Sequence, residues 1–343
     1  MQSKSVGIVG ASGYSGELLV RLLSRHPGVE RLVVASRGYA GKRLVEVLPS
    51  IGPSRFEDSL FIESDPAALA ESDIEVFFLA LPHGVASEFA LPLVKAGKTV
   101  IDLSADFRLF SAEVYQEYYG EAHPAPTWLS KVPYLLPEWN GREDLEAPLI
   151  ACPGCYPTSV LLPLLPLLEA GLIDADQLVI NAVSGVSGAG KKASEFYSFC
   201  ERTQSVTAYG LAKHRHLGEI EEQLSKASGN PVVLQFTPHL VPMDRGIAAT
   251  MVAPLKSSLE DVYAAWDKRY GQCPFVRILT TGKAANTRHV VGSNCIEFSA
   301  TADPRTGRVI VTSAIDNLMK GASGQAVQIF NLKFGFEETG GLL

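Results

Sequence analysis

The fold is decided by the segment Gly10-Ala11-Ser12-Gly13-Tyr14-Ser15-Gly16, which stands near the start of the chain. A short apolar run, Ser5–Val9, precedes it and predicts a strand, and Glu17–Ser24 follows it with the pattern of a helix. Its three glycines permit a tight turn, let backbone amides approach a pyrophosphate, and let helix and strand pack closely. The phosphate would lie at the positive end of the helix. The segment therefore predicts a dinucleotide-binding loop, with a purely structural turn as the alternative.

Continuous apolar runs recur after this loop and alternate with helical stretches. Strands are predicted at Leu32–Ala35, Val76–Ala80 and Thr99–Leu103. Runs of this kind are typical of a parallel sheet that is covered by helices on both faces. The proline-rich segment 122–148 has weak periodicity, and we place the crossing into a second domain there. The first domain is therefore expected to be Rossmann-like.

The second half of the chain has a different pattern. Leu149–Cys152 predicts a strand that runs into a turn, and Thr158–Ala170 predicts a helix that is apolar on nearly all sides and therefore buried. Further strands are expected at Leu178–Val183, Val232–Thr237, Ala248–Val252, Cys295–Ala300 and Val309–Ala314. The expected fold class is α/β, with a Rossmann-like dinucleotide-binding domain over residues 1–148 that a C-terminal helix in 315–343 completes. An α+β catalytic and oligomerisation domain with a mixed sheet is expected over residues 149–314.

Size and composition narrow the class of protein. A chain of 343 residues suits about two domains. The net charge of −7 argues against nucleic-acid binding, which usually needs a basic face. The longest apolar run, Val160–Leu168, is too short to span a bilayer and contains two prolines. No signal peptide is apparent and the five cysteines are unevenly spaced, so we expect a cytoplasmic protein with reduced thiols and no membrane partner.

The end of the second predicted strand bears on the choice of cofactor. NAD-binding domains usually place a carboxylate there to hold the ribose diol, whereas this chain has Ala35-Ser36-Arg37. An arginine can bind the 2′-phosphate of NADP through charge-assisted hydrogen bonds. We therefore expect NADPH in preference to NADH, with Ser36 and Arg37 among its contacts. A solvated Arg37 with no role in cofactor binding is the alternative.

Cys155 is the candidate nucleophile, in the segment Pro153-Gly154-Cys155-Tyr156-Pro157-Thr158. It lies at a predicted strand-to-helix junction, where the helix dipole stabilises an anion by about 0.3–1 kcal/mol. At about 1.36 kcal/mol per pKa unit the dipole lowers a thiol pKa by roughly one unit, so a neighbouring base has to supply the rest. A thiolate can hold an acyl group while hydride reaches its carbonyl carbon. Together with the glycine loop, Cys155 suggests interconversion of an aldehyde and an activated acid.

Other interpretations of the cysteines stay open. A buried structural cysteine is the usual one, and we retain it for Cys200, Cys273 and Cys295. Cys152 and Cys155 form a C-x-x-C pair, which could be a redox dithiol, although that would not explain the dinucleotide-binding loop. A metal site would need two more ligands at suitable spacing, and the sequence has no second pair of this kind, so no metal is expected.

Other segments of the chain supply candidate bases and candidate anion-binding residues. His214 and His216 flank Arg215 just before a predicted helix, and their imidazoles point in similar directions if the backbone is extended. One of them could take the thiol proton and later manage protons at the hydride step. Arg108 could bind a substrate phosphate or carboxylate through two hydrogen bonds. The glycine-rich loop Ser184–Lys192 could meet the same anion through its amides and lysines, with Ser184 and Lys191 as contacts.

Taken together, these segments resemble the N-acetyl-gamma-glutamyl-phosphate reductases, relatives of aspartate-semialdehyde dehydrogenase, over nearly the whole chain. The segments that carry the resemblance are Gly10–Gly16, Leu79–Gly84, Ile101–Arg108, Pro153–Thr158, Ser184–Lys191, His214–Glu219, Phe236–Pro242 and Asp316–Gly321. The resemblance implies NADPH-dependent reductive dephosphorylation of N-acetyl-L-glutamyl 5-phosphate to N-acetyl-L-glutamate 5-semialdehyde, in arginine biosynthesis. A small-molecule acyl phosphate would be the substrate, and inorganic phosphate would be released.

The resemblance also implies roles for individual residues. Cys155 would carry the thioacyl intermediate, and His216, in preference to His214, would be the acid–base. The expected NADP(H)-binding residues are Gly10, Ser12, Gly13, Tyr14, Ser15, Gly16, Ser36, Arg37, Leu81, Pro82, Ser187, Gly188 and Asn317. The second domain would form a homodimer or homotetramer.

One departure from the family stands next to the nucleophile, because the family commonly has asparagine where this chain has Cys152. A thiol would polarise a thioester carbonyl poorly. Two hypotheses follow: backbone amides take over that task, or Cys152 forms an inhibitory disulfide with Cys155. Two alternative functions also stay open. One is the homologous reductase of lysine biosynthesis, whose aminoadipyl phosphate is one methylene longer, a difference worth about 1–3 kcal/mol in a pocket. The other is a catalytically silent NADP-binding regulator.

Overall fold

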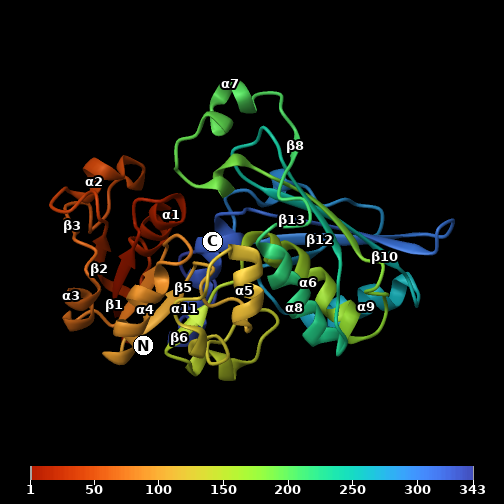
Figure 1. Cartoon of the computed structure of the whole chain (residues 1–343), viewed down its shortest axis with the longest axis horizontal. Helices are drawn as coiled ribbons and strands as arrows, with labels where there is room; N and C mark the ends of the chain where they lie inside the picture. Colours follow the sequence, from red (N-terminus) through yellow and green to blue (C-terminus); the bar gives the residue numbers. More distant parts are fainter. Residues whose placement is uncertain (1, 343) are drawn as a thin grey trace. The chain divides into compact units, whose positions relative to one another are not determined.

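The computed structural model describes residues 2–342, and the chain divides into two compact units. The first unit comprises the chain up to Gln116, Glu121–Pro153, and the chain from Ala322 onward. The second unit comprises Glu117–Gly120 and Gly154–Gly321. Figure 1 labels many of the helices and strands of both units.

The first unit contains a six-stranded sheet in the order β3-β2-β1-β4-β5-β6, in which every pair is parallel. Its strands are β1 (Lys4–Val9), β2 (Val29–Ala35), β3 (Phe61–Ile62), β4 (Val76–Leu79), β5 (Thr99–Asp102) and β6 (Leu149–Ala151). The strand order reverses between β1 and β4, and ligands of open parallel sheets bind at such a switch point, beyond the carboxyl ends of the strands. The glycine loop follows β1, and Leu81-Pro82 follows β4. The predicted Rossmann-like sheet is confirmed.

Helices cover both faces of this sheet. They are α1 (Tyr14–Leu23), α2 (Leu44–Val47), α3 (Pro66–Glu71), α4 (Ala86–Lys95) and α11 (Gly324–Phe334), with 3₁₀ turns η1 (Pro49–Ile51), η2 (Pro126–Trp128) and η3 (Arg142–Glu146). Phe77 of β4 packs in a buried cluster with Phe89 and Leu93 of α4. The ring of the next residue, Phe78, lies 5.9 Å from that of Phe330 on α11. Because successive strand residues point to opposite faces, α4 and α11 lie on opposite sides of the sheet.

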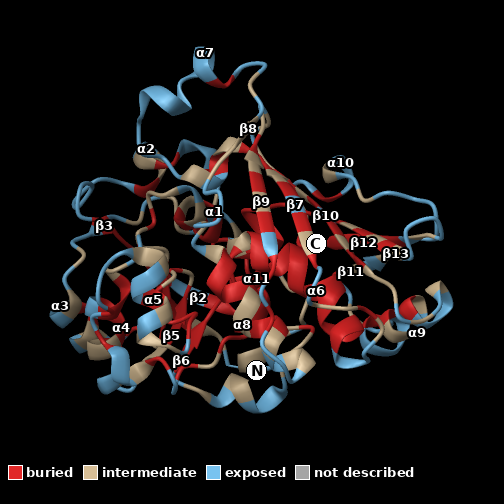
Figure 2. Ribbon diagram, turned by 45° about the vertical axis from the view of Figure 1, so that its right-hand side comes forward, coloured by how far each residue is buried: buried red, intermediate tan, exposed pale blue. Residues whose placement is uncertain are grey.

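The second unit contains a seven-stranded sheet in the order β11-β12-β13-β10-β7-β9-β8. Its strands are β7 (Val179–Ser184), β8 (Thr207–Ala208), β9 (Gln235–Leu240), β10 (Ile247–Pro254), β11 (Val276–Ile278), β12 (Ile296–Asp303) and β13 (Arg308–Ile315). Pairs β7–β9 and β11–β12 are parallel and the others are antiparallel, so the predicted mixed sheet is confirmed. Buried residues gather on its central strands (Figure 2).

The helices of the second unit pack on this sheet and on one another. They are α6 (Cys155–Glu169), α7 (Phe199–Arg202), α8 (His216–Ser228), α9 (Leu259–Tyr270) and α10 (Thr287–Val290), with 3₁₀ turns η4 (Val186–Ala189) and η5 (Glu195–Tyr197). Helix α5 (Ala112–Tyr119) crosses from the first unit into the second, and the π-helical turn η6 (Met319–Ser323) crosses back. Helix α6 contacts β10, β13, α8 and α9, so it lies at the centre of the unit.

Helix α6 tolerates two internal prolines because other elements satisfy the carbonyl groups that the prolines leave without an N–H partner. A proline in a helix cannot donate to the carbonyl four residues earlier. For Pro163 that carbonyl belongs to Ser159, and the Ser313 hydroxyl donates to it at 2.6 Å. For Pro166 it belongs to Leu162, and the Tyr270 hydroxyl donates to it at 2.7 Å. Elements β13 and α9 therefore supply the donors for these two carbonyl groups of the helix.

Three sequence-based boundaries need correction. Leu149–Ala151 pairs with β5 in the first sheet, so the boundary predicted at 148/149 moves to 153/154. Helix α6 begins at Cys155 and not at Thr158, because Gly154 takes the extended N-cap conformation and the Thr158 amide already donates to its carbonyl at 2.9 Å. The C-terminal helix predicted within 315–343 is divided into the π-helical turn and α11, and the boundary predicted at 314/315 moves to 321/322.

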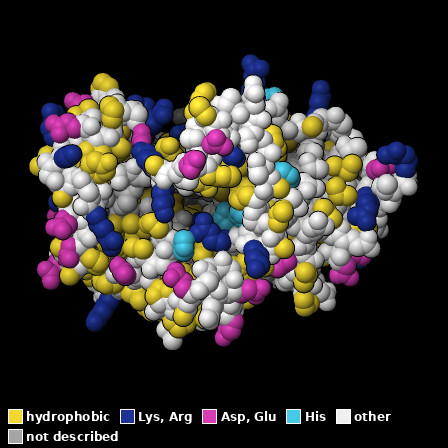
Figure 3. Space-filling view, turned by 45° about the horizontal axis from the view of Figure 1, so that its top comes forward, with side chains coloured by type: hydrophobic (Ala, Val, Ile, Leu, Met, Phe, Trp, Pro, Cys, Tyr) yellow, Lys and Arg dark blue, Asp and Glu magenta, His cyan; other side chains and the backbone are white. Residues whose placement is uncertain are grey.

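The distribution of surface charge and the apolar character of the helices bear on the class of protein. Acidic and basic side chains are interspersed over the face shown in Figure 3, with no extended basic area on it. Within residues 2–342, no helix combines the length and the apolar character that crossing a membrane requires.

Candidate active site

Cys155 is the first residue of α6, and its side chain is half-buried. Gly154 caps the helix in an extended conformation, with φ −71° and ψ 163°. The Gly154 amide donates to Glu219 Oε1 of α8 at 2.7 Å, and that carboxylate is 1% exposed. A helix N-terminus stabilises an anion through its dipole and its first-turn amides. The fold therefore places the sulfur where a thiolate is favoured and anchors the turn that carries it.

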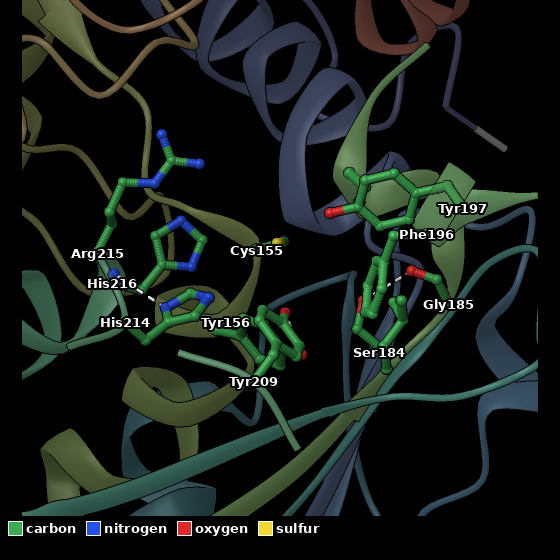
Figure 4. Close-up of a pocket in the computed structure, with 13 residues that line it drawn as sticks. Cys155, Tyr156, Ser184, Gly185, Phe196, Tyr197, Tyr209, His214, Arg215 and His216 are labelled. Atoms are coloured by element: carbon green, nitrogen blue, oxygen red, sulfur yellow. Dashed lines mark hydrogen bonds between the residues drawn. The ribbon is translucent and has the colours of Figure 1, made fainter. Parts of the chain in front are cut away.

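His214 and His216 lie at the start of α8, with ring centroids 5.0 Å apart. The His216 amide donates to His214 Nδ1 at 3.1 Å, so a neutral His214 carries its proton on Nε2 (Figure 4). Burial, and secondarily the charge of Arg215, lowers the pKa of His214 to about 4. His214 therefore stays uncharged near neutral pH and is poorly suited to releasing a proton as an imidazolium ion.

The two histidines pack around Tyr156, which follows the cysteine. Its ring centroid lies 5.3 Å from that of His214 and 5.9 Å from that of His216. The hydroxyl groups of Tyr156 and Tyr209 lie 2.9 Å apart. Burial raises the pKa of Tyr156 well above its usual range and that of Tyr209 to about 12, so both phenols stay protonated. The pair forms a neutral part of the cavity wall that also includes Cys155.

These side chains line one cavity of about 270 Å³ in the second unit. Its lining consists of Cys155, Tyr156, Ser184, Gly185, Gly188, Ala189, Phe196, Tyr197, Tyr209, His214, Arg215, His216 and Leu240. Figure 4 shows His214 and His216 on one side of Cys155, with Phe196 and Tyr197 on the other. A nucleophile, imidazoles, a guanidinium and aromatic rings therefore converge on a space that suits a small organic anion.

The predicted substrate contacts occupy different places. Ser184 lines the cavity, and its hydroxyl donates to the Gly185 carbonyl at 3.0 Å. Lys191 is exposed and lies outside the cavity lining. Arg108, in the first unit, is 8% exposed; its Nε donates to the Cys152 carbonyl at 2.8 Å and one terminal nitrogen donates to that of Leu103 at 2.7 Å. Those two donors brace the chain just before the cysteine turn.

Asn317 and Ser187 are brought together as part of a bracing network. Asn317 Oδ1 accepts from the Gly246 amide at 2.7 Å, and its Nδ2 donates to Ser187 Oγ at 3.0 Å. Both residues are buried. Asn317 therefore fixes the η4 turn, from which Gly188 reaches the cavity.

The glycine loop of the first unit fits a dinucleotide. Gly10 has φ +83°, and a Cβ on it would lie 2.4 Å from the Ala80 carbonyl oxygen. A Cβ on Gly16 would lie 2.2 Å from the Gly10 carbonyl oxygen, so the first and last glycines are required by the fold itself. A Cβ on Gly13 would meet its nearest atom only at 3.6 Å, an ordinary contact. The protein itself does not demand glycine at position 13, which is consistent with room kept for a phosphate at the start of α1.

The other predicted cofactor residues surround the same switch point. Ser12 and Ser36 lie with their hydroxyl oxygens 3.3 Å apart. The Arg37 side chain is 70% exposed, with its guanidinium 3.7 Å from the Glu88 carboxylate, so a ligand can reach it. Tyr14 and Ser15 open helix α1, and Leu81 and Pro82 follow β4. These positions agree with a cofactor bound along the carboxyl edge of the sheet.

Cys152 is fully buried in the first unit, unlike Cys155. Its amide donates to the Asp102 carbonyl at 2.8 Å, and burial together with the Asp102 carboxylate raises the pKa of its thiol. Burial also raises the pKa of Asp102 to about 7. A thiol in this setting is a weak nucleophile. Within residues 2–342, no cluster of three or more His, Cys, Asp or Glu side chains could hold a metal ion.

Sequence reasoning missed several residues at this site. The sequence singles out Glu219 only as part of a motif and Arg215 only as the residue between the two histidines, yet Glu219 anchors Gly154 and Arg215 lines the cavity. Phe196, Tyr197 and Tyr209 were not singled out, because their segments have no regular periodicity. The aromatic content of 195–209 was the only available signal, and aromatic residues in a loop have many possible causes.

Comparison with known families adds independent information. The family model of the semialdehyde dehydrogenase NAD binding domain matches residues 5–147, and that of the semialdehyde dehydrogenase dimerisation domain matches residues 155–317. An N-acetyl-gamma-glutamyl-phosphate reductase of Akkermansia muciniphila is 49% identical, over 100% of this chain and 99% of the relative. Relatives of the same name from Desulforudis audaxviator and Pseudomonas aeruginosa are 47% and 46% identical, over 98% of this chain and 97% of each relative.

Solved structures agree on the fold. An aspartate semialdehyde dehydrogenase II of Vibrio cholerae has a TM-score of 0.73 at 19% identity, over 98% of this chain and 99% of that one. An aspartate semialdehyde dehydrogenase of Candida albicans, solved with NADP, has a TM-score of 0.70 at 18% identity, over 96% of this chain and 98% of that one. At these identities the likeness establishes the architecture of the chain.

Proposed function

The chain belongs to the N-acetyl-gamma-glutamyl-phosphate reductases of the semialdehyde dehydrogenase family, and we propose that it performs their reaction. That reaction is the NADPH-dependent reductive dephosphorylation of N-acetyl-L-glutamyl 5-phosphate to N-acetyl-L-glutamate 5-semialdehyde, a step of arginine biosynthesis. One observation carries the proposal: Cys155, at the N-terminus of a buried helix, lines the same cavity as His214 and His216.

Cys155 is the nucleophile in this proposal. Its thiolate attacks the acyl carbon, which forms a C–S bond, breaks the C–O bond to phosphate and releases inorganic phosphate. NADPH, when bound, supplies the hydride that reduces the thioester carbon. The oxygen of the resulting tetrahedral adduct takes a proton from His216 and returns it as the C–S bond breaks, so that the aldehyde and the Cys155 thiolate form with no net gain or loss of a proton. The first-turn amides of α6 stabilise the negative charge on sulfur at both ends of the cycle.

His216 is the acid–base, and His214 orients it. His216 takes the proton of the Cys155 thiol and later gives a proton to the substrate oxygen. His214, with its pKa lowered to about 4, stays neutral and accepts the His216 amide at 3.1 Å, which fixes the first turn of α8. Arg215, the guanidinium in the cavity lining, pairs with the phosphate or the α-carboxylate of the substrate.

NADP(H) binds the first unit through the glycine loop, Ser12 and Ser36, with Arg37 on the 2′-phosphate. The glycine loop supports this through the space at Gly13, and Arg37 through its exposure at the end of β2. Ser187 and Gly188 contribute from the η4 turn, which Asn317 holds in place. The first unit is then the cofactor-binding domain, and the second is the catalytic and oligomerisation domain.

The second unit also joins copies of the chain into a homodimer or homotetramer, in a cytoplasmic enzyme. The match of residues 155–317 to a dimerisation domain supports the assembly. Light scattering of the purified protein distinguishes these two states from a monomer, and a monomeric enzyme with full activity would contradict this part of the proposal.

The experiment runs the reaction in reverse. Purified protein is mixed with N-acetyl-L-glutamate 5-semialdehyde, NADP⁺ and inorganic phosphate, and NADPH is followed by absorbance. We expect phosphate-dependent NADPH formation that is abolished in Cys155→Ser. The aminoadipyl semialdehyde that is one methylene longer is the matched competitor, and a higher kcat/KM with it would assign the chain to the lysine branch. No turnover with either substrate would favour a silent NADP-binding regulator.

A further inference from the structure

Gly321 packs directly against the nucleophile. It belongs to the π-helical turn η6, and its amide donates to the Asp316 carbonyl, five residues back, at 3.0 Å. A Cβ on Gly321 would lie 2.7 Å from Cys155 Cβ and 3.1 Å from Cys155 Cα. Carbon atoms in contact prefer a separation of about 3.5–4.0 Å. We propose that Gly321 is a positioning residue, which sets the place of the Cys155 side chain by leaving room only for a hydrogen behind it.

The need for glycine does not come from the backbone of Gly321 itself. Its φ lies outside the positive range that favours glycine, so an alanine could adopt the same conformation. A side chain at position 321 is excluded because Cys155 leaves no space for a Cβ atom. After the two Cys155 atoms, the next nearest atom to such a Cβ is Ile315 Cδ1, at 3.2 Å, and that is the flexible end of a side chain.

The turn that carries Gly321 is held from several sides. The fully buried Asp316 carboxylate accepts from the amides of Leu318, Met319 and Gly292 at 2.8, 3.0 and 2.8 Å. Asn317 is tied to the Gly246 amide at 2.7 Å. Because the turn cannot easily retreat, a methyl group at position 321 has to displace Cys155. π-Helical turns within helices are often found at functional sites, and here the turn brings a bare backbone up to the nucleophile.

The size of the displacement follows from these distances. A contact of 2.7 Å is about 0.8 Å short of an ordinary carbon–carbon contact. A misplacement of about 1 Å in reacting groups costs about 10²-fold in rate. We therefore expect Gly321→Ala to lower kcat by about 10- to 100-fold. The dissociation constant of NADPH should stay within about twofold, because the methyl group lies against Cys155 and not in the cofactor loop.

This inference rests on the proposed role of Cys155, so its test includes measurements that need no turnover. Alkylation of Cys155 by iodoacetamide is followed across pH by mass spectrometry of its peptide. In Gly321→Ala the profile of Cys155 should shift to higher pH, because the sulfur moves away from the amides of α6. The exposed Cys200 serves as an internal control and should react as in the wild type. An unchanged Cys155 profile together with kcat within about threefold of wild type would overturn the inference.

Two further variants separate positioning from general destabilisation. A Cβ on Gly28 would lie 2.5 Å from Phe336 Cζ in the first unit, so Gly28→Ala adds a methyl clash of similar size away from Cys155. It should lower the melting temperature and leave kcat unchanged. Trimming Ile315 in the double variant Ile315→Val/Gly321→Ala should not restore activity. A full recovery there, or an equal loss of kcat in Gly28→Ala, would refute the contact with Cys155 as the cause.

A stability cycle covers the case in which Gly321→Ala does not fold. Cys155→Gly removes the atom that the new methyl group meets, so Gly321→Ala should cost much less melting temperature in the Cys155→Gly background than in the wild type. Equal losses in both backgrounds, or a double variant that also fails to fold, would show that the two residues are not coupled. Either outcome would overturn the inference, whatever reaction the enzyme proves to catalyse.

Discussion

Glu219 ties the helix of the proposed nucleophile to the helix of the proposed base, and its removal should separate the two. Its carboxylate is 1% exposed and accepts the buried Gly154 amide at 2.7 Å. Gly154 is the residue before Cys155, and Glu219 stands one turn after His216 on α8. This hydrogen bond therefore helps to set the position of the Cys155 sulfur relative to the His216 imidazole.

The structure gives the size of the effect. In Glu219→Ala the Gly154 amide is left buried without this acceptor, which costs about 1–3 kcal/mol. At about 2–4 °C per kcal/mol for a unit of 150–250 residues, the melting temperature should fall by about 2–12 °C. Because the N-cap of α6 also loses its anchor, kcat should fall by about 10²-fold. Glu219→Gln keeps an oxygen that can accept from the Gly154 amide, and the neutral hydrogen bond should be roughly half as strong as the charged one. Its kcat should therefore fall less than that of Glu219→Ala.

The assay pairs thermal unfolding with steady-state kinetics, and α8 supplies the matched control. Glu221 Oε1 accepts the Leu234 amide at 3.0 Å, so Glu221→Ala breaks a similar bond on the same helix away from Cys155. It should lower the melting temperature and keep the wild-type kcat. If Glu219→Ala kept its kcat while losing stability, or if Glu221→Ala lost kcat equally, Glu219 would be shown to stabilise the fold without positioning the nucleophile.

The remaining predictions concern Arg37, the two histidines and Tyr270. Arg37→Asp should lower the ratio of kcat/KM for NADPH over NADH about tenfold, since the side chain is 70% exposed and its charge is screened; an unchanged ratio would contradict the 2′-phosphate assignment. His216→Gln should lower kcat by about 10²–10⁴-fold, the usual range for an acid–base, and His214→Gln by less; steady-state rates in the reverse order would exchange the two roles. Burial lowers the pKa of His214 to about 4 from 6.5, so the unfolded state takes up the proton first and up to about 3 kcal/mol of stability should be lost as pH falls from 6.5 to 4. Urea unfolding measures this, and His214→Phe should lack that part of the loss. Tyr270→Phe should cost about 1–3 kcal/mol of stability with kcat unchanged, because the Leu162 carbonyl loses its donor.

The elements that sequence could predict are those set by local pattern. The glycine loop, the apolar parallel strands and the mixed sheet all follow from periodicity and turn chemistry. The assignment of Leu149–Ala151 to a sheet could not be predicted, because an apolar run of three residues can pair with either neighbour and only tertiary contact with β5 decides. The start of α6 was placed three residues late for a related reason, since Pro157 looks like a helix start and is also accommodated in the first turn of a helix that begins at Cys155.

The candidate site divides in the same way. Cys155, His214, His216 and Ser184 could be found from residue type and spacing, and all four line one cavity. Arg108 and Asn317 were equally prominent in the sequence, yet Arg108 donates to two backbone carbonyls, and Asn317 bonds a backbone amide and a serine hydroxyl within the protein. Sequence shows that a polar residue is needed and does not show whether its partner is a ligand or a loop.

Polar residues near a nucleophile can serve the protein and not the ligand, because the turn that carries the nucleophile has backbone groups that need hydrogen-bond partners. A cysteine held at the open end of a buried helix leaves nearby backbone groups that the helix itself cannot satisfy. In this chain Glu219 takes the Gly154 amide, and Arg108 takes the Cys152 carbonyl. Gly321 contributes by having no side chain at all. Motif residues around Cys155 are therefore explained as much by holding the turn as by touching substrate, and variants at such positions should change kcat while leaving KM nearly unchanged, because the groups that contact substrate remain in place.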